Sequence, residues 1–185
     1  MYEVELKFRV TDAAEAERRI AALGGRLADA VEQVDRYFAH PARDFAVTDE
    51  ALRLRRTGDD VVVTWKGPRL DATTKTRREI ELGVAPAPDG IATIASWTDL
   101  LEALGFRQVR EVAKRRRIAV VPWEGSAIEA ALDDVAGLGV FLELEVQAAA
   151  ADVAAARGRV ESLANALGCT AAERRSYLEL LLATG

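Results

Sequence analysis

The chain has little cysteine, histidine or extended apolar sequence. Cys169 is the only cysteine among 185 residues. A single cysteine cannot form an internal disulfide, which favours a reducing compartment such as the cytoplasm. We expect Cys169 to be a small packing residue. His40 is the only histidine, whereas zinc sites draw on several His or Cys ligands. No apolar run approaches the roughly 18 residues of a transmembrane helix, and the charged N-terminus lacks a signal-peptide core.

Basic residues are outnumbered by acidic ones: 25 Lys and Arg against 30 Asp and Glu give a net charge of −5. That balance argues against a surface that coats nucleic acid, although a local basic pocket remains compatible with it. The sequence shows no Rossmann fingerprint, catalytic triad or zinc motif. We expect a single domain over residues 1–185, a length that buries a sizeable core.

What the chain has in abundance is charge at alternate positions. Glu3, Glu5 and Lys7 alternate with apolar residues, which predicts a strand over 1–10 with one charged and one apolar face. Such a face is commonly the wet side of an antiparallel sheet. Here the pattern recurs at 52–55, 63–66, 77–81, 114–117 and 143–145. The repetition predicts a barrel whose charged face lines a wet lumen and whose apolar face is covered by helices.

Local signals predict an α+β fold, with an eight-stranded antiparallel β-barrel, or tunnel, and helices packed outside. Strands are expected at 1–10, 31–38, 50–57, 60–66, 77–82, 109–121, 126–133 and 140–147. Helices are expected at about 12–23, 91–104, 150–167 and 171–183, the last opened by a Thr170-x-x-Glu173 capping box. Residues 67–76 lack periodicity and form either a gate over bound phosphates or a connection without a role.

The residues expected to face inward carry both signs of charge. The acids are Glu3, Glu5, Glu79, Glu81, Asp133, Glu143 and Glu145, and the bases are Lys7, Arg9, Arg53, Arg55, Lys66, Arg77, Lys114 and Arg116. Crowding like charges into one cavity is costly unless ligands neutralise both sets. Carboxylates suit Mg²⁺ or Mn²⁺, and Lys and Arg suit phosphate oxygens. A metal-bound triphosphate satisfies both sets.

These segments resemble the CYTH proteins, also called triphosphate tunnel metalloenzymes, which include class IV adenylyl cyclases, thiamine triphosphatases and inorganic triphosphatases. The resemblance spans nearly the whole chain, from Glu3-Val4-Glu5 to Ser176–Leu181. It implies a tunnel with metal ligands among Glu3, Glu5, Glu143 and Glu145. It also implies triphosphate binding by Lys7, Arg53, Arg55, Lys66, Lys114 and Arg116. Some cyclases of this class lack parts of the L-R-x-R motif or of the final E-x-E motif. This chain keeps both, at 52–55 and 143–145, as triphosphatases do.

We therefore predict a Mg²⁺- or Mn²⁺-dependent enzyme that acts on a small-molecule triphosphate. The preferred reaction converts ATP to cyclic AMP and pyrophosphate; a triphosphatase and a non-catalytic polyphosphate- or nucleotide-binding module are the alternatives. The predicted partners include a second copy in a homodimer, but neither nucleic acid nor membrane. The predicted metal ligands are Glu3, Glu5, Asp133, Glu143 and Glu145. The predicted substrate-binding residues are Lys7, Arg53, Arg55, Lys66, Arg77, Lys114 and Arg116, of which Lys7, Lys66 and Lys114 are also predicted to be catalytic.

Overall fold

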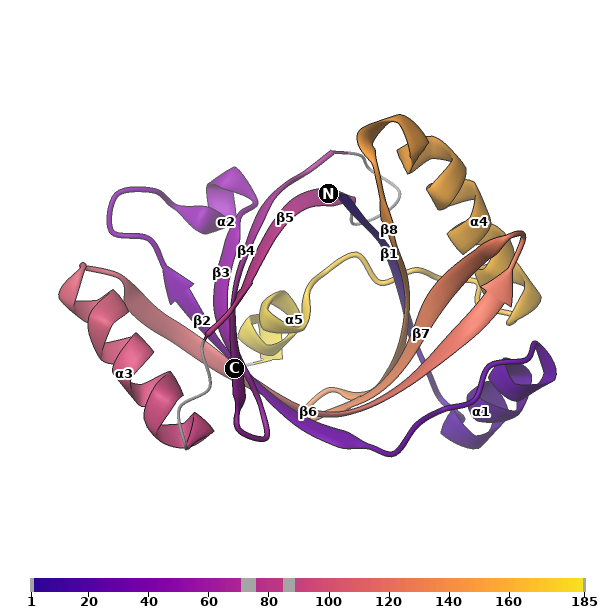
Figure 1. Cartoon of the computed structure of the whole chain (residues 1–185), viewed down its shortest axis with the longest axis horizontal. Coiled ribbons are helices and arrows are strands. Elements are labelled where there is room, and N and C mark those ends of the chain that lie inside the picture. The colour runs from indigo at the N-terminus through magenta and orange to yellow at the C-terminus, as the bar shows by residue number, and fades with distance from the viewer. Residues whose placement is uncertain (1, 71–75, 85–88, 185) are drawn as a thin grey trace.

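The computed structural model describes residues 2–70, 76–84 and 89–184, and its strands close into an eight-stranded antiparallel barrel (Figure 1). The order around the barrel is β1-β5-β4-β3-β2-β6-β7-β8. The strands are β1 (Tyr2–Arg9), β2 (Val31–Ala39), β3 (Ala51–Thr57), β4 (Asp60–Arg69), β5 (Arg77–Gly83), β6 (Arg107–Trp123), β7 (Ser126–Val135) and β8 (Gly139–Ala148). The predicted α+β barrel is confirmed.

Three helices cover the apolar outer face of the barrel, as Figure 1 shows: α1 (Ala13–Ala22), α3 (Gly90–Ala103) and α4 (Val153–Ala166). Leu6 of β1 belongs to the core that includes Ile20 of α1 and Val160 of α4. Leu54 of β3 belongs to a second core with Ile94 of α3. Burial of these apolar side chains stabilises the barrel from outside. A 3₁₀ turn, Ala150–Asp152, leads into α4, and no helix in the described ranges is long and apolar enough to cross a membrane.

The barrel interior carries the charged side chains. Glu3, Glu5 and Lys7 alternate with the apolar residues of β1 and are all buried, with Lys7 only 1% exposed. Together with charged residues from the other strands they line a cavity of about 800 Å³. The period-2 pattern of the sequence therefore separates an apolar outer face from a charged lumen.

Two segments near the cavity differ from the expectation. Residues 67–69 are not a loop but the end of β4, because Asp49 accepts bonds from the Arg69 backbone and side chain and Leu70 N donates to Thr76 O (2.8 Å). Residues 71–75 lie outside the described part of the chain, so the gate stays a prediction. A short helix that we did not predict, α2 (Phe45–Thr48), begins after Asp44, whose side chain accepts from Ala46 N.

The start of the last helix was predicted wrongly. Helix α5 (Tyr177–Thr184) is preceded by Ser176, whose Oγ accepts from Glu179 N (3.1 Å) while its own N donates to the Glu179 carboxylate (2.5 Å). The capping box is therefore Ser176-x-x-Glu179 rather than Thr170-x-x-Glu173. Residues before it are extended because they pair with β1: Ala172 forms a bridge with Phe8, and Glu173 N donates to Lys7 O (2.7 Å).

Helix α5 departs from the outer arrangement of the other helices. In Figure 1 it lies within the ring of strands. Tyr177 and Leu181 of α5 pack in one buried core with Tyr37 of β2, Val112 of β6 and Phe141 of β8. Tyr37 and Tyr177 also line the cavity. The helix thus fills part of the barrel interior, and its first turn faces the charged lumen.

Candidate active site

Three carboxylates meet on one wall of the lumen. Glu3 and Glu5 come from β1 and Glu145 from β8, and each offers an oxygen within 4.8 Å of the others. The strand register explains the cluster, since Glu5 lies directly opposite Glu145. Burial and the charges of Glu3 and Glu5 raise the pKa of Glu145 to about 8. A set of crowded carboxylate oxygens suits a hard divalent cation, which would relieve their repulsion.

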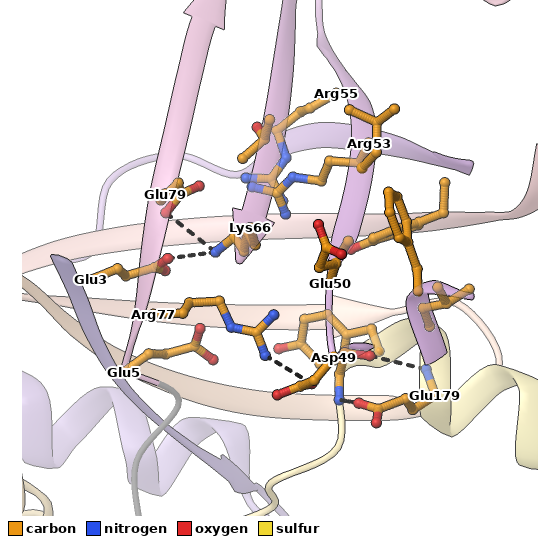
Figure 2. A pocket seen from close by; sticks show the side chains of 18 of the residues that line it. Glu3, Glu5, Asp49, Glu50, Arg53, Arg55, Lys66, Arg77, Glu79 and Glu179 are labelled. Carbon is orange, nitrogen blue, oxygen red and sulfur yellow. Dashed lines mark hydrogen bonds and ion pairs between the residues drawn. The ribbon is translucent and has the colours of Figure 1, made fainter. Parts of the chain in front are cut away.

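Lys66 of β4 connects this acidic cluster to the basic side of the lumen. Its Nζ lies 2.5 Å from Glu3 Oε2 and 3.5 Å from Glu79 Oε2, and Figure 2 shows it pointing at both carboxylates. Burial opposes ionisation of Glu3, but the charge and hydrogen bond of Lys66, a hydrogen bond with Glu79 and the charge of Arg53 together outweigh it and lower the pKa of Glu3 to about 2. Burial and a hydrogen bond with Glu3 raise the pKa of Glu79 to about 7. Lys66 therefore touches one of the clustered acids directly.

Arg53 and Arg55 of β3 are held by Asp35 of β2. Arg55 donates two hydrogen bonds to the Asp35 carboxylate, at 2.6 and 2.7 Å, and Arg53 Nη1 lies 3.3 Å from Asp35 Oδ2. Asp35 is 1% exposed. Burial opposes its ionisation, yet the charges of Arg53 and Arg55 hold the pKa of Asp35 below its usual range. The bidentate pair fixes the guanidinium plane of Arg55 in the lumen.

A second carboxylate, Asp133 of β7, holds the bases of β6. It accepts from Arg116 Nε (2.7 Å) and Nη2 (2.6 Å), from Lys114 Nζ (3.0 Å) and from the hydroxyl of Tyr177 (3.0 Å). Arg116 also bonds to Glu143 of β8. Burial and the nearby positive charges of Arg116 and Arg55 lower the pKa of Lys114 to about 8. Asp133 and Glu143 thus contact bases, and neither belongs to the three-carboxylate cluster.

The remaining predicted residues divide between the lumen and its ends. Lys7 Nζ lies 3.9 Å from the centroid of the Tyr177 ring. Arg77 of β5 lines the cavity, with Nη2 3.6 Å from Asp49 Oδ1 (Figure 2). Arg9, expected to face inward, is exposed and donates to the carbonyl of Leu138, which places it away from the cavity lining.

Two side chains that shape the site were missed from the sequence. Asp35 alternates with Gln33 and Tyr37 in the predicted strand 31–38, so the same period-2 argument would have placed it in the lumen. Tyr177 had no such signal. It belongs to a helix, and only the entry of α5 into the barrel brings it to Lys7 and Asp133.

Comparison with known proteins identifies the family. A model of the CYTH domain matches residues 1–177. The chain belongs to the CYTH domain family. Within it, a candidate adenylate cyclase of Methanocaldococcus jannaschii is 38% identical over 145 residues, which cover 78% of this chain and 77% of that protein. Adenylate cyclase CyaB of Aeromonas hydrophila is 30% identical over 189 residues, covering 97% of this CYTH protein and 88% of the relative.

A solved structure shows the same architecture over the full length. The PH1819 protein of Pyrococcus horikoshii OT3 superposes with a TM-score of 0.84 at 36% sequence identity, and the match covers 99% of each chain. The closed barrel of this CYTH chain is therefore shared with a relative whose fold is known.

Proposed function

We propose that this CYTH protein is a Mg²⁺- or Mn²⁺-dependent enzyme that binds ATP in the barrel lumen and converts it to cyclic AMP and pyrophosphate. The observation that carries the proposal is the meeting of a carboxylate cluster and a set of buried bases in one cavity, with Lys66 in contact with Glu3. The candidate adenylate cyclase of Methanocaldococcus jannaschii and the adenylate cyclase CyaB of Aeromonas hydrophila, at 38% and 30% identity, support this choice of reaction.

In this proposal Glu3, Glu5 and Glu145 hold the cation, because their oxygens lie within 4.8 Å of one another. When bound, Mg²⁺ or Mn²⁺ would polarise phosphate oxygens and offset their negative charge. Asp133 and Glu143, which the sequence placed among the metal ligands, are assigned instead to holding Arg116. That assignment follows from their contacts with the guanidinium.

The bases bind the triphosphate and stabilise the leaving group. In the cyclase reaction the 3′-hydroxyl of ATP attacks the α-phosphorus, its proton is lost, and the bond to the bridging oxygen breaks to release pyrophosphate. Negative charge grows on pyrophosphate as that bond breaks. Lys7, Lys66 and Lys114 are the catalytic residues in this scheme, because each is buried or half-buried in the lumen and carries a compact charge to those oxygens. Arg53, Arg55, Arg77 and Arg116 complete the substrate-binding set.

An apolar region of the cavity supports a nucleotide rather than an inorganic substrate. The lining includes Phe45 of α2, Val109 of β6, and Leu178 and Leu182 of α5. Val109 and Leu182 are 42% and 50% exposed, so this part of the cavity opens to solvent. Apolar side chains stabilise a flat heterocycle but gain nothing from a bare phosphate chain.

A triphosphatase is the second candidate, because both arginines of the L-R-x-R motif line the lumen and Arg55 is held rigidly by Asp35. In that reaction water attacks the terminal phosphorus and orthophosphate leaves. A non-catalytic polyanion receptor would use the same bases. It would gain nothing from the carboxylates of Glu3, Glu5 and Glu145, which repel phosphate in the absence of a cation.

The test is a product analysis with three substrates. The protein is incubated with Mg²⁺ or Mn²⁺ and with ATP, tripolyphosphate or thiamine triphosphate separately, and cyclic AMP, pyrophosphate and orthophosphate are quantified. We expect cyclic AMP and pyrophosphate in equal amounts from ATP. Orthophosphate as the main product would instead establish the triphosphatase, and the absence of turnover would favour the receptor.

Matched arginine variants show whether the lumen carries the activity. Arg55→Ala removes a base that lines the cavity, whereas Arg9→Ala removes an exposed base that does not. Loss of turnover in the first variant alone is the expected result. Equal activity of both variants would place the reaction outside the barrel.

A further inference from the structure

The C-terminal segment contacts β1 at Lys7. The backbone carbonyl of Lys7 accepts a hydrogen bond from Glu173 N (2.7 Å), and Ala172 forms a bridge with the neighbouring Phe8. Four residues further along, the Tyr177 ring covers the side chain of the same lysine, with its centroid 3.9 Å from Nζ. One segment thus holds both the backbone and the ammonium group of Lys7.

Tyr177 is itself fixed on several sides. It is 6% exposed, its ring packs edge-on against Phe141 with centroids 5.1 Å apart, and its hydroxyl donates to Asp133 Oδ2 (3.0 Å). The ammonium of Lys114 lies 5.3 Å from the same ring centroid. A ring held in this way keeps one orientation toward the two lysines.

We propose that Tyr177 is a positioning residue for triphosphate binding, which holds the Lys7 ammonium against its ring face and steadies Asp133, and through it Arg116, by its hydroxyl. The inference rests on the proposed function, because the triphosphate is the ligand that these bases serve. It assigns to α5 a part in the site that goes beyond filling the barrel.

A neutral aromatic ring suits Lys7 better than a carboxylate would, for an electrostatic reason. A cation over an aromatic face is attracted by the ring quadrupole, and the attraction grows when water is excluded. The ring is neutral, so it stabilises a buried ammonium without adding a negative charge beside the phosphate. Lys7 is 1% exposed, which gives the contact the desolvated setting in which it is strongest.

A double-mutant cycle tests the inference. The ligand is bis-methylene triphosphate with Mg²⁺, because its bridging carbons resist cleavage, and dissociation constants are measured by titration calorimetry on the full chain. We expect Tyr177→Leu to weaken binding roughly 10-fold, as for a desolvated cation–π contact. In the Lys7→Met background the same change should weaken binding much less, because the contacts of Tyr177 with Asp133 and Lys114, but not that with Lys7, remain to be lost. Tyr177→Phe, which keeps the ring, should lose much less.

Leu180→Ala is the matched control, since Leu180 lies in the same buried core of α5 and has no contact with a base among those found for the described residues. A change that only loosens α5 should weaken binding equally with Lys7 and with Met at position 7. An equal effect of Tyr177→Leu in both backgrounds would overturn the inference. Absence of binding by the unmodified protein would overturn the proposed function as well, so the two failures are distinguishable.

A second experiment compares two aromatic residues at position 177 and does not require Tyr177→Leu to fold. Phenylalanine and pentafluorophenylalanine at position 177 have similar shapes, but fluorination reverses the charge of the ring face. Weaker binding with the fluorinated ring is expected when Lys7 is present. Equal binding with both rings would show that the ring does not act on the ammonium.

Discussion

At the scale of residues, the lumen is organised by bases that are already paired with carboxylates. Arg55 is held by Asp35, and Arg116 is held by Asp133. Pairs of this kind offset the cost of burying a charge and fix the direction of the remaining N–H groups. In the proposed function, a phosphate chain would therefore meet bases whose orientation is set before it binds.

Removal of one clustered carboxylate should weaken cation binding. Glu5→Gln is expected to lower Mn²⁺ affinity by more than roughly 10-fold, since changes even one shell further from a metal cost that much. The control is Glu81→Gln, because Glu81 lines the same cavity, accepts a hydrogen bond from Thr64 and is not part of the three-carboxylate cluster. Mn²⁺ titration followed by electron paramagnetic resonance measures both. Equal affinities of the two variants would remove Glu5 from the metal site.

Lys114 should take up a proton when a polyanion binds. Burial and the charges of Arg116 and Arg55 lower the pKa of Lys114 to about 8, so at pH 8.5 much of it is neutral. A bound phosphate favours the ammonium form and raises that pKa. Calorimetric titration with tripolyphosphate at pH 8.5, in two buffers of different ionisation enthalpy, measures the uptake. Lys114→Met should abolish most of it; an unchanged uptake would assign the proton to another group.

At the scale of elements, β1 joins the three parts of the molecule. Its apolar face packs against α1 and α4, its charged face supplies Glu3, Glu5 and Lys7 to the lumen, and its edge pairs with the C-terminal segment. Among the residues that the structure describes, β1 pairs with β5 at Tyr2 and Glu3, and Phe8, further along β1, forms a bridge with Ala172. The C-terminal segment therefore helps to close the barrel and carries α5 inward.

The observed capping box predicts which serine or threonine matters for α5. Ser176→Ala removes the acceptor for Glu179 N and should lower the free energy of unfolding by about 1 kcal/mol. Thr170→Ala is the control, because Thr170 is exposed and precedes the extended segment. Its effect should stay within about 0.5 kcal/mol. Urea denaturation measures the free energy of unfolding of both variants. A larger loss for Thr170→Ala than for Ser176→Ala would support a helix that begins at residue 171.

At the scale of the whole molecule, the buried carboxylates should give metal-free protein a stability maximum in mildly acidic solution. The pKa of Glu145 is raised to about 8 and that of Glu79 to about 7, so their protonated forms favour the folded state. Stability from these groups falls as pH rises from their unfolded pKa of about 4 through the folded values. The pKa of Asp35 is held below its usual range and that of Glu3 is about 2, so their contribution falls as pH drops below about 4.

We therefore expect the free energy of unfolding to peak between about pH 4 and 6. Urea denaturation at a series of pH values in EDTA measures the curve. Glu145→Gln should flatten its alkaline side and leave the acid side in place. A curve that rises steadily from pH 5 to 8 would show that Glu145 and Glu79 are not strained by burial in the folded protein.

Much of the barrel could be predicted from the sequence because the evidence was periodic. Alternation in β1 predicted both the strand and its buried charged face, and the same rule placed Arg53, Arg55 and Lys114 in the lumen. A period of two depends only on neighbouring residues along one strand. The wrong helix start at Thr170 also came from local evidence. The Thr170-x-x-Glu173 pattern is typical of a helix cap, but the segment pairs with β1 instead, where Glu173 N donates to Lys7 O.

The sequence by itself determined most of the strand residues that face inward, with Arg9 as an exception, and only the tertiary structure decided which of them meet. Glu143 and Glu145 share one face of β8, and no local pattern distinguishes them. The register between β1 and β8 sets Glu5 opposite Glu145 and Lys7 opposite Glu143. That register, like the entry of Tyr177 into the barrel, depends on how segments far apart in the chain pack together, because hydrogen bonding and burial between strands select it.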